Sequence, residues 1–453
     1  MPEGLIRDRL RGADDLPAIL WRGTTVSHAQ LREAIGATRD RLVEEGIQEG
    51  SVVALLGDFS PTAIAAELAL FELDCVVAPL RVEEETRHDE LFAIAEAEWV
   101  VTVGADDALT ARPTGVGAEN KLLRELGEDR RPGLILISSG TSGVPKGALH
   151  DVTRLLSKFD RPARPVSMLA FLLFDHVGGV NTMLHALLHG GRLVTLDDRS
   201  PDAVGAAIEK HGAELLPTSP TFLNLFLISR VDERYDLSSL SVISYGSEPM
   251  SEFTLKTLRE RLPQVKLHQT YGMTELGIPV SKSRSSDSLW MKFAGENCAY
   301  RVRDGMLELR TATAMLGYLN APSPFTDDGW LMTGDAVEVD GEWIHVLSRR
   351  SELINVGGQK VVPVEVESVV EELEGVEEAV VSAEPSPLTG HLVCATVRLS
   401  KDEQLQEFRR RLRRHCRGRL PRYMVPQKVV LSDRPLRSDR HKKQRSSSSE
   451  GQR

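Results

Sequence analysis

Residues 134–147 read LILISSGTSGVPKG, a short apolar run followed by a loop rich in glycine and hydroxyl side chains. The run LILI predicts a buried strand. The glycines after it let backbone N–H groups point inward around a polyanion, and the ammonium of Lys146 adds positive charge. The spacing differs from G-x-x-x-x-G-K-[ST], because the glycines lie closer together and Pro145 precedes the lysine. The pattern predicts a phosphate-binding loop made of Ser138, Ser139, Gly140, Thr141, Ser142, Gly143 and Lys146.

Similar short apolar runs, closed by Gly, Ser or Asp, recur on both sides of this loop. They are SVVALLGDFS (51–60), GRLVTLDD (191–198) and LSVISYGSEP (240–249). Stretches with helical periodicity lie between them. This alternation predicts an α/β fold with buried, largely parallel strands.

The pattern changes after residue 300, where strand-like segments are joined by Asp-Gly and Gly-Glu turns. We expect a β-rich subdomain over about 296–348, within a large N-terminal domain that spans 1–348. Residues 349–445 then read as a small α+β C-terminal domain, in which residues 404–416 place Leu405, Phe408, Leu412 and Cys416 on one helical face. The tail 446–453 is low in complexity and is expected to be disordered.

The composition is that of an ordinary soluble globular chain, with 453 residues, 41% of them hydrophobic and 27% charged. The first residues, MPEGLIRDRLRGADDL, carry charges where a secretory signal needs an apolar run. No apolar run approaches the roughly 18 residues that span a bilayer. We therefore expect a cytoplasmic protein with no membrane partner. The cysteines, Cys75, Cys298, Cys394 and Cys416, lie far apart and are expected to be free thiols, mostly buried.

Charge is distributed unevenly along the chain. The net charge is −11, yet residues 401–453 hold 17 Lys and Arg against 6 Asp and Glu, a net charge of +11. This basic region is suited either to binding a polyanion or to forming a solvated surface. Apart from Phe408 and Tyr423, it has no aromatic residues between the basic ones, so a nucleic-acid partner is not expected.

Further motifs follow the phosphate loop in a fixed order. They are Phe174-Asp175-His176-Val177-Gly178-Gly179, Tyr245-Gly246-Ser247-Glu248-Pro249, Tyr271-Gly272-Met273-Thr274-Glu275, Thr333-Gly334-Asp335 and the stretch RRSELINVGGQKVVPVEVE from Arg349 to Glu367. With the loop, this series resembles the adenylate-forming superfamily of acyl-CoA synthetases, peptide-synthetase adenylation domains and luciferases. The resemblance covers nearly the whole chain and is strongest to acyl-CoA ligases.

The resemblance implies an ATP/AMP site whose residue types suit their roles. Tyr271 would stack on adenine, and Thr274 would offer its hydroxyl to the α-phosphate. Glu275 would supply a carboxylate oxygen to Mg²⁺, while Asp335 and Arg349 would bind the ribose. The remaining nucleotide contacts are assigned to Gly246, Ser247, Glu248 and Gly272.

The acyl pocket is assigned by the same resemblance to Asp175, His176, Gly178, Gly179, Tyr245 and Gly277. The glycines would leave room for a bulky acyl group or would serve the backbone geometry.

In this family the C-terminal domain rotates between an adenylating pose and a thioester-forming pose. The resemblance places the hinge at Ser351, where a few residues absorb a large backbone change. Gly357 and Gly358 would face a pantetheine arm in the second pose. The acceptor would be coenzyme A, whose nucleotide suits the basic C-terminal region, or a carrier-protein phosphopantetheine.

One motif departs from the family pattern. A Pro-x-x-x-x-Gly-Lys loop normally brings a lysine to the substrate carboxylate and the α-phosphate. Counting from Pro435 puts Arg440 at the glycine and His441 at the lysine, and Lys442 replaces the lysine only if the loop bulges by one residue. Losing one preorganised donor typically slows a reaction by about 10²–10³.

The sequence thus predicts an acyl-CoA ligase that forms a thioester through an acyl-adenylate. A sharper hypothesis is that adenylation is weak or lost, and that the enzyme mainly thioesterifies acyl-AMP made by a separate adenylating enzyme. Two alternatives stay open: an adenylation enzyme that loads an acyl or amino acid onto a carrier protein, and a non-catalytic acyl-AMP-binding protein. An Asp175 pointing into the acyl pocket would favour an amino-acid substrate.

Overall fold

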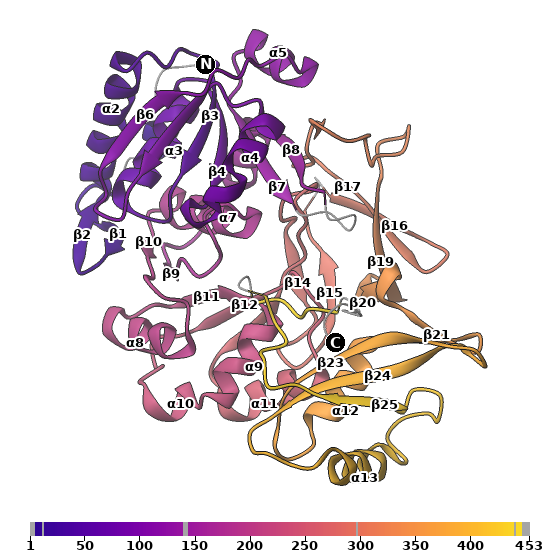
Figure 1. The fold of residues 1–453 in the computed structure, drawn as a ribbon. Helices are drawn as coiled ribbons and strands as arrows, with labels where there is room; N and C mark the ends of the chain where they lie inside the picture. The colour runs from indigo at the N-terminus through magenta and orange to yellow at the C-terminus, as the bar shows by residue number, and fades with distance from the viewer. Residues whose placement is uncertain (1–4, 11–12, 139–143, 296–297, 439–440, 446–453) are drawn as a thin grey trace.

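A computed structural model describes residues 5–10, 13–138, 144–295, 298–438 and 441–445. Figure 1 shows a large N-terminal domain and a smaller C-terminal domain below it. The two domains meet at helices α11 (Glu252–Arg261) and α12 (Pro363–Glu371). The mixed α/β architecture predicted from the sequence is confirmed.

The first sheet surrounds the phosphate loop. Its strands run in the order β18 (Gly317–Tyr318), β8 (Lys146–Asp151), β7 (Gly133–Ser138), β4 (Val76–Leu80), β3 (Val52–Leu56), β5 (Trp99–Val103) and β6 (Leu109–Pro113). The central strands β7, β4, β3 and β5 pair in parallel. Because β3 and β4 are apolar along their whole length, all of their residues are buried between helices.

A second sheet of similar design follows. Its order is β13 (Lys266–Gln269), β12 (Val242–Tyr245), β11 (Leu215–Thr218), β9 (Ser167–Leu169), β10 (Arg192–Val194), β1 (Pro17–Trp21) and β2 (Thr24–Ser27). All of its pairs are parallel except β1 with β2. The ligand-binding edge of such a sheet lies beyond the carboxyl ends of its strands.

The helices of the large domain cover these two sheets and join their strands. They are α1 (Leu5–Arg9), α2 (His28–Glu44), α3 (Pro61–Glu72), α4 (His88–Ala95), α5 (Lys121–Glu128), α6 (Val152–Leu156), α7 (Val177–Leu188), α8 (Pro201–His211), α9 (Pro220–Ile228), α10 (Val231–Arg234) and α11. Short 3₁₀ turns span Val82–Arg87 and Ser157–Phe159.

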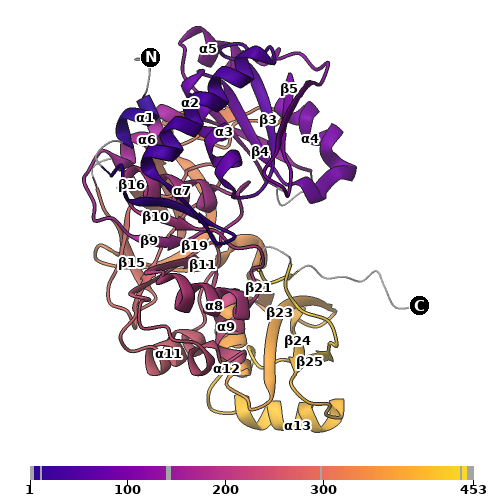
Figure 2. The same cartoon turned by 90° about the vertical axis from the view of Figure 1, so that its left-hand side faces the viewer.

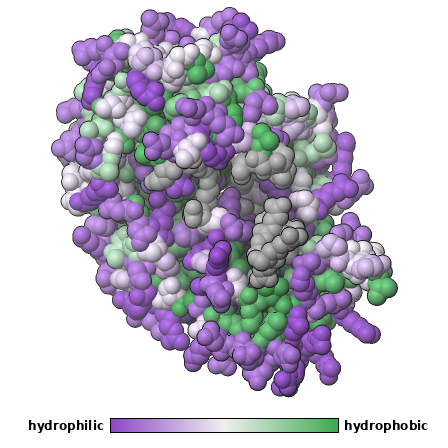
Figure 3. Space-filling model, in the orientation of Figure 1, coloured by the Kyte–Doolittle hydropathy of each residue, from purple (hydrophilic) through white to green (hydrophobic). Residues whose placement is uncertain are grey.

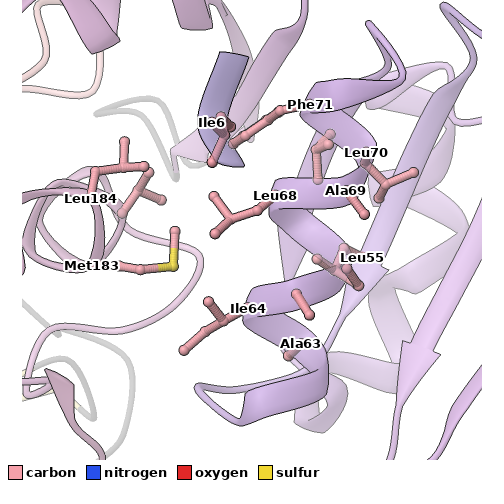
Figure 4. Packing of buried hydrophobic residues seen from close by; sticks show 14 of the residues in the cluster. Ile6, Leu55, Ala63, Ile64, Leu68, Ala69, Leu70, Phe71, Met183 and Leu184 are labelled. Atoms are coloured by element: carbon pink, nitrogen blue, oxygen red, sulfur yellow. The ribbon is translucent and has the colours of Figure 1, made fainter. Parts of the chain in front are cut away.

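Helix α3 is buried on nearly every side, as its apolar sequence requires. Figure 4 shows Leu55 of β3 on one side of α3, and Met183 and Leu184 of α7 on the other, facing Ile64 and Leu68. This packing fixes helix α7, whose N-terminus carries the predicted acyl-pocket motif.

The β-rich subdomain is an antiparallel sheet. Its order is β14 (Ser281–Ser283), β15 (Trp290–Phe293), β20 (Trp343–Arg349), β19 (Leu331–Asp340), β17 (Met306–Thr311) and β16 (Cys298–Arg303). It begins at residue 281, earlier than the predicted 296. Asp304 and Gly305 both have positive φ, of 51° and 74°, in the turn between β16 and β17. This is the two-residue hairpin turn that Asp-Gly favours.

The C-terminal domain consists of helices packed on one sheet. Helix α12 is followed by β23 (Val376–Ser386), β24 (Gly390–Leu399), α13 (Leu405–Cys416) and β25 (Lys428–Leu431), and the sheet also includes β21 (Ile354–Val356) and β22 (Gln359–Val361). Helix α13 buries Phe408, Leu412 and Cys416 on one face. Figure 2 shows this domain beside helices α8, α9 and α11, with α13 at its end farthest from the first sheet.

The surface seen in Figure 3 is mostly hydrophilic, with apolar side chains gathered low on this face. Among the described residues, no helix is long and apolar enough to cross a membrane. The four cysteines are free, and all except the half-buried Cys298 are buried, as expected.

Candidate active site

A cavity of about 170 Å³ lies where the carboxyl ends of β12 and β13, strands β19 and β20, and the C-terminal loop meet. Its wall brings together segments far apart in sequence. They are Ser247, Glu248, Pro249, Gln269, Thr270, Tyr271, Gly272, Met273, Asp335, Val346, Ser348, Arg349, Glu352, Lys442, Lys443 and Arg445. Most of the residues predicted to bind adenine and ribose are in this set, so we call it the nucleotide cavity.

Asp335 is the centre of a polar network in this cavity. It pairs directly with Arg349 across β19 and β20, and Arg349 Nε lies 2.8 Å from Asp335 Oδ1. The hydroxyl of Tyr271 donates to the other carboxylate oxygen. Burial raises the pKa of Asp335, although Arg349 and Tyr271 oppose this. The three residues predicted to hold the nucleoside therefore form one connected unit.

The predicted phosphate side is built around Glu275. Its Oε1 accepts a hydrogen bond of 2.5 Å from the hydroxyl of Tyr318, and Lys146 Nζ lies 5.2 Å from the Tyr318 ring centroid. The carbonyl of Thr274 accepts a 2.6 Å bond from His150 Nε2, which fixes this turn. Ser138 and Lys146 pair across β7 and β8, while the predicted residues Ser139, Gly140, Thr141, Ser142 and Gly143 lie outside the described residues.

No group of three or more His, Cys, Asp or Glu among the described residues is placed to hold a metal ion. A single carboxylate at Glu275 still fits Mg²⁺, because that ion is usually bound by one or two carboxylates together with substrate phosphates. When bound, the ion would neutralise phosphate charge.

A second cavity of about 260 Å³ adjoins the nucleotide cavity, and the two share Ser247, Thr270 and Gly272. We call it the acyl cavity. Its wall consists of Lys158, Met168, Leu172, His176, Val177, Gly178, Asn181, Thr182, His185, Leu215, Pro217, Thr218, Val242, Ser244, Gly246, Ser247, His268, Thr270, Gly272, Ile278, Pro279, Val280 and Ser281. A Cβ on Gly246 would lie 2.5 Å from the carbonyl oxygen of Thr270, so glycine is required there.

The predicted acyl-pocket residues divide into two groups. His176 and Gly178 line the cavity, and His176 Nδ1 accepts a 3.0 Å hydrogen bond from the Gly178 N–H at the start of α7. Tyr245 does not line it; its ring is 1% exposed within the hydrophobic core, so its assignment to the substrate pocket is corrected. Alternation along β12 turns Tyr245 away from the cavity and Ser244 toward it.

Asp175 is buried and is also absent from the cavity wall. A Cβ on Gly179 would lie 1.9 Å from the carbonyl oxygen of Leu173, so this glycine serves backbone packing. Gly277, with φ of +71°, borders a smaller neighbouring cavity of about 20 Å³.

The predicted hinge and pantetheine residues line neither of these two cavities. Ser351 is exposed in the 3₁₀ turn Arg350–Glu352, directly after β20. Gly357 and Gly358 form the hairpin turn between β21 and β22, with φ of 58° and 89°. Neither glycine lines a described cavity in this domain arrangement.

The described parts of the C-terminal loop, residues 435–438 and 441–445, run antiparallel to each other, and the second part contacts the large domain. Gln444 N–H donates to the carbonyl of Leu436, and Ser438 N–H to that of Lys442. His441 has φ of +50°, and its ring packs 5.5 Å from that of Phe171 and 5.3 Å from that of Phe222.

The backbone of this loop is held by the large domain at two points. Ser219 donates a 2.7 Å hydrogen bond to the carbonyl of His441. Glu248 accepts bonds from the N–H groups of Thr221 and Lys443, at 2.8 and 3.3 Å. Lys442 thereby lines both the nucleotide cavity and a small cavity of about 30 Å³ beside His176 and Ser247.

The end of the loop carries an ion cluster that the sequence analysis missed. Lys443 Nζ lies 3.0 Å from Glu367 and 2.8 Å from Glu371, and Arg445 contacts Glu367 at 2.8 Å and Glu352 at 3.0 Å. Burial alone would raise the pKa of Glu367, but Lys443 and Arg445 lower it to about 2. We call these five residues the clasp. The sequence showed only that the region around Lys443 and Arg445 is basic, because their carboxylate partners lie about 70 to 90 residues earlier in the chain.

Sequence models of known families match both domains. The model described as AMP-binding enzyme matches residues 6–297, and that of the AMP-binding enzyme C-terminal domain matches residues 365–443. The chain belongs to the AMP-binding enzyme family and thus to the adenylate-forming superfamily, which confirms the resemblance.

Two similar proteins are CoA ligases. The indoleacetate–CoA ligase of Aromatoleum aromaticum is 28% identical over 92% of this chain and 91% of its own length. The 2-succinylbenzoate–CoA ligase of Listeria monocytogenes is 24% identical over 95% of each chain. Together with the family, these relatives identify the chain as an enzyme of the ligase type.

Solved structures share the fold across the whole chain. The amide bond synthetase McbA of Marinactinospora thermotolerans matches with a TM-score of 0.74, 24% identity and 96% coverage of each chain. The o-succinylbenzoate CoA synthetase of Bacillus subtilis, in complex with its acyl-adenylate, matches with a TM-score of 0.76 at 21% identity, covering 100% of this chain and 99% of that one.

Proposed function

We propose that this protein is an acid–thiol ligase that joins a carboxylic acid to coenzyme A through an acyl-adenylate. The observation that carries the proposal is the position of Lys442. It lines the nucleotide cavity together with Ser247, one of the three residues that this cavity shares with the acyl cavity. A cation there can bind the substrate carboxylate and stabilise charge that develops at the α-phosphate.

The backbone of the loop supports this role for Lys442. With φ of +50°, His441 has the left-handed conformation that glycine adopts easily. A loop bulged by one residue puts His441 at the glycine of the family pattern and Lys442 at its lysine. The aromatic contacts of the His441 ring with Phe171 and Phe222 hold this register.

In the proposed reaction Tyr271, Asp335 and Arg349 hold the nucleoside, while Lys146 and Glu275 lie on the phosphate side. Mg²⁺ at Glu275 would neutralise phosphate charge. The acid carboxylate attacks the α-phosphorus and pyrophosphate leaves. After rotation about Ser351, the thiol attacks the acyl carbonyl, AMP leaves, and the thiol proton passes to solvent.

The proposal includes both half-reactions, and the more restricted hypothesis, thioesterification of supplied acyl-AMP alone, remains testable beside it. ATP–pyrophosphate exchange with a panel of acids measures the first half-reaction, and thioester formation from synthetic acyl-AMP measures the second. We expect Lys442→Ala to lower exchange by about 10²–10³ while thioester formation falls much less.

Lys401→Ala, at an exposed lysine, is the matched control and should change neither activity. Absence of exchange in the intact enzyme, with thioester formation retained, would establish the restricted hypothesis. The restricted hypothesis also predicts that a variant with glycine at position 440 and lysine at position 441 would gain ATP–pyrophosphate exchange. Loss of both activities in the wild type would instead favour a non-catalytic acyl-AMP-binding protein.

The choice of coenzyme A over a carrier protein rests on the named relatives and the basic C-terminal region. Amino-acid activation has less support, because Asp175 is absent from the wall of the acyl cavity. Comparing coenzyme A with phosphopantetheinylated carrier protein as acceptors tests this choice.

A further inference from the structure

The wall of the acyl cavity includes a lysine that the proposed reaction does not use. The cavity meets the nucleotide cavity at Ser247, Thr270 and Gly272. Lys158 lines the acyl cavity but not the nucleotide cavity, and it also lines two smaller cavities beside it. A bound acid that placed its reacting carboxylate at Ser247 would therefore extend toward Lys158.

The ammonium of Lys158 is held by neutral oxygens. Its Nζ donates to Asn181 Oδ1 at 2.5 Å and to the carbonyl of Ile278 at 2.7 Å. A lysine ammonium has three N–H donors, so one donor remains beyond these two bonds. Burial lowers the pKa of Lys158 to about 8, which still leaves the group largely cationic at pH 7.

The surroundings do not neutralise this charge. Among the described residues that line the acyl cavity there is no aspartate or glutamate. His185 also lines it, and burial, His189 and Lys158 lower the pKa of its ring to about 4. Burial also lowers the pKa of His268. The imidazoles of His185 and His268, with lowered pKa values, and the ammonium of Lys158 thus face a cavity whose described wall has no carboxylate, although buried charges in proteins are normally paired.

We propose that Lys158 is a specificity-determining residue that pairs with a second carboxylate, at the far end of the acid that this ligase activates. This inference rests on the proposed function for the orientation of the acid. The substrate class is then a compact dicarboxylic acid, since the cavity of about 260 Å³ lies below the usual size of drug-sized ligand pockets.

Direct binding, measured without turnover, tests the inference. Isothermal titration calorimetry with AMP present would compare aliphatic and aromatic dicarboxylic acids with matched monocarboxylic acids that carry a methyl group instead of the second carboxylate. For the best dicarboxylate we expect affinity at least about 10-fold above that for its partner. Lys158→Met should abolish this difference, and Lys158→Arg should retain part of it.

Lys401→Met is the control at an exposed lysine, and thermal unfolding checks that every variant is folded. Equal affinities for both acids of each pair, or no effect of Lys158→Met on dicarboxylate binding, would overturn the inference. So would stronger binding by an amide than by the carboxylate. Selective dicarboxylate binding without pyrophosphate exchange or thioester formation would support Lys158 while refuting the proposed function.

Discussion

Lys158 and Lys443 are both lysines in largely buried surroundings, but the fold treats them in opposite ways. Lys443 lies between Glu367 and Glu371, at 3.0 and 2.8 Å, and these carboxylates raise its pKa despite burial. Lys158 donates to neutral oxygens of Asn181 and Ile278 and lies 5.5 Å from the Phe159 ring centroid, and burial lowers its pKa. In the clasp the protein itself supplies the carboxylates that pair with the lysine, whereas in the acyl cavity we infer that a bound ligand supplies the carboxylate.

Lys443 and Lys158 show how a buried charge that serves the structure differs from one that serves binding. A buried cation that is paired with carboxylates stabilises the local structure. Removing one partner of such a pair lowers stability, because the remaining charge is then buried without compensation. A buried cation without a carboxylate partner lowers stability, and such an arrangement is typical of binding sites.

The largest effect is expected from Glu367→Gln, which would make the clasp resemble the acyl cavity. Glu367 contacts both Lys443 and Arg445 and is fully buried, so its loss leaves two cations with less compensation. We expect the free energy of unfolding to fall by about 3–5 kcal/mol in urea titrations. The matched control, Glu374→Gln, changes an exposed side chain. Equal stability of the two variants would show that the clasp is dispensable.

The second effect concerns Glu67, a buried carboxyl group with no described hydrogen-bond partner. Burial raises its pKa from 4.5 to about 8. Between these values the folded state holds a proton that the unfolded state has lost, so stability falls as pH rises. The contribution is about 1.4 kcal/mol per pH unit at most, and Glu67→Gln should remove it.

Urea titrations from pH 5 to pH 8 measure this slope, with the exposed Glu45→Gln as control. A wild-type slope unchanged in Glu67→Gln would assign the pH dependence to other groups.

A smaller gain in stability is expected from Lys158→Met. Because the folded-state pKa of Lys158 is lowered from 10.5 to about 8, the cost of burying its charge is fully present below pH 8 and disappears above about 10.5. Allowing for the loss of two hydrogen bonds, we expect the variant to be about 1–2 kcal/mol more stable at pH 7. Urea unfolding at pH 7 would detect this gain, and a destabilised variant would indicate a structural role.

Asn181→Asp is expected to have the smallest effect and would make the acyl cavity resemble the clasp. The new carboxylate would stand 2.5 Å from Lys158 Nζ and neutralise it. Dicarboxylate affinity should then fall by about 10-fold while monocarboxylate affinity stays unchanged, as measured by calorimetry. Retained dicarboxylate selectivity would show that another group provides it.

Much of the fold was predictable because apolar runs and turn residues are local signals. The run LILI gave β7, and the spacing of Phe408, Leu412 and Cys416 gave the buried face of α13. The antiparallel sheet began earlier than predicted because its first strand, Ser281–Ser283, is short and polar. This strand pairs with β15 of the same sheet, and the pairing depends on that neighbouring strand more than on the residues of Ser281–Ser283.

The site was less predictable. Tyr271, Asp335 and Arg349 meet as expected because each belongs to a family motif. Lys158 belongs to no such motif, and in the sequence it follows a helical segment as a surface lysine would. Its hydrogen bond to the carbonyl of Ile278, 120 positions later, forms only in the folded chain. The assignment of Tyr245 failed because its motif spans a strand end, where neighbouring side chains point to opposite faces.

The seam between the two domains has a consequence for salt dependence. Five of its hydrogen bonds join Ser219 to His441, Glu248 to Lys443, Ser251 to Glu371, Phe253 to Ser368 and Asn224 to Glu377. None of the five is an ion pair, and the charges of the clasp lie within residues 352–445. A rotation about Ser351 would move the two cations and three carboxylates of the clasp together, as a unit with a formal charge of −1, and would exchange these five bonds for bonds to water. The balance between the two poses should therefore respond only weakly to ionic strength, in contrast to interfaces held by charge pairs.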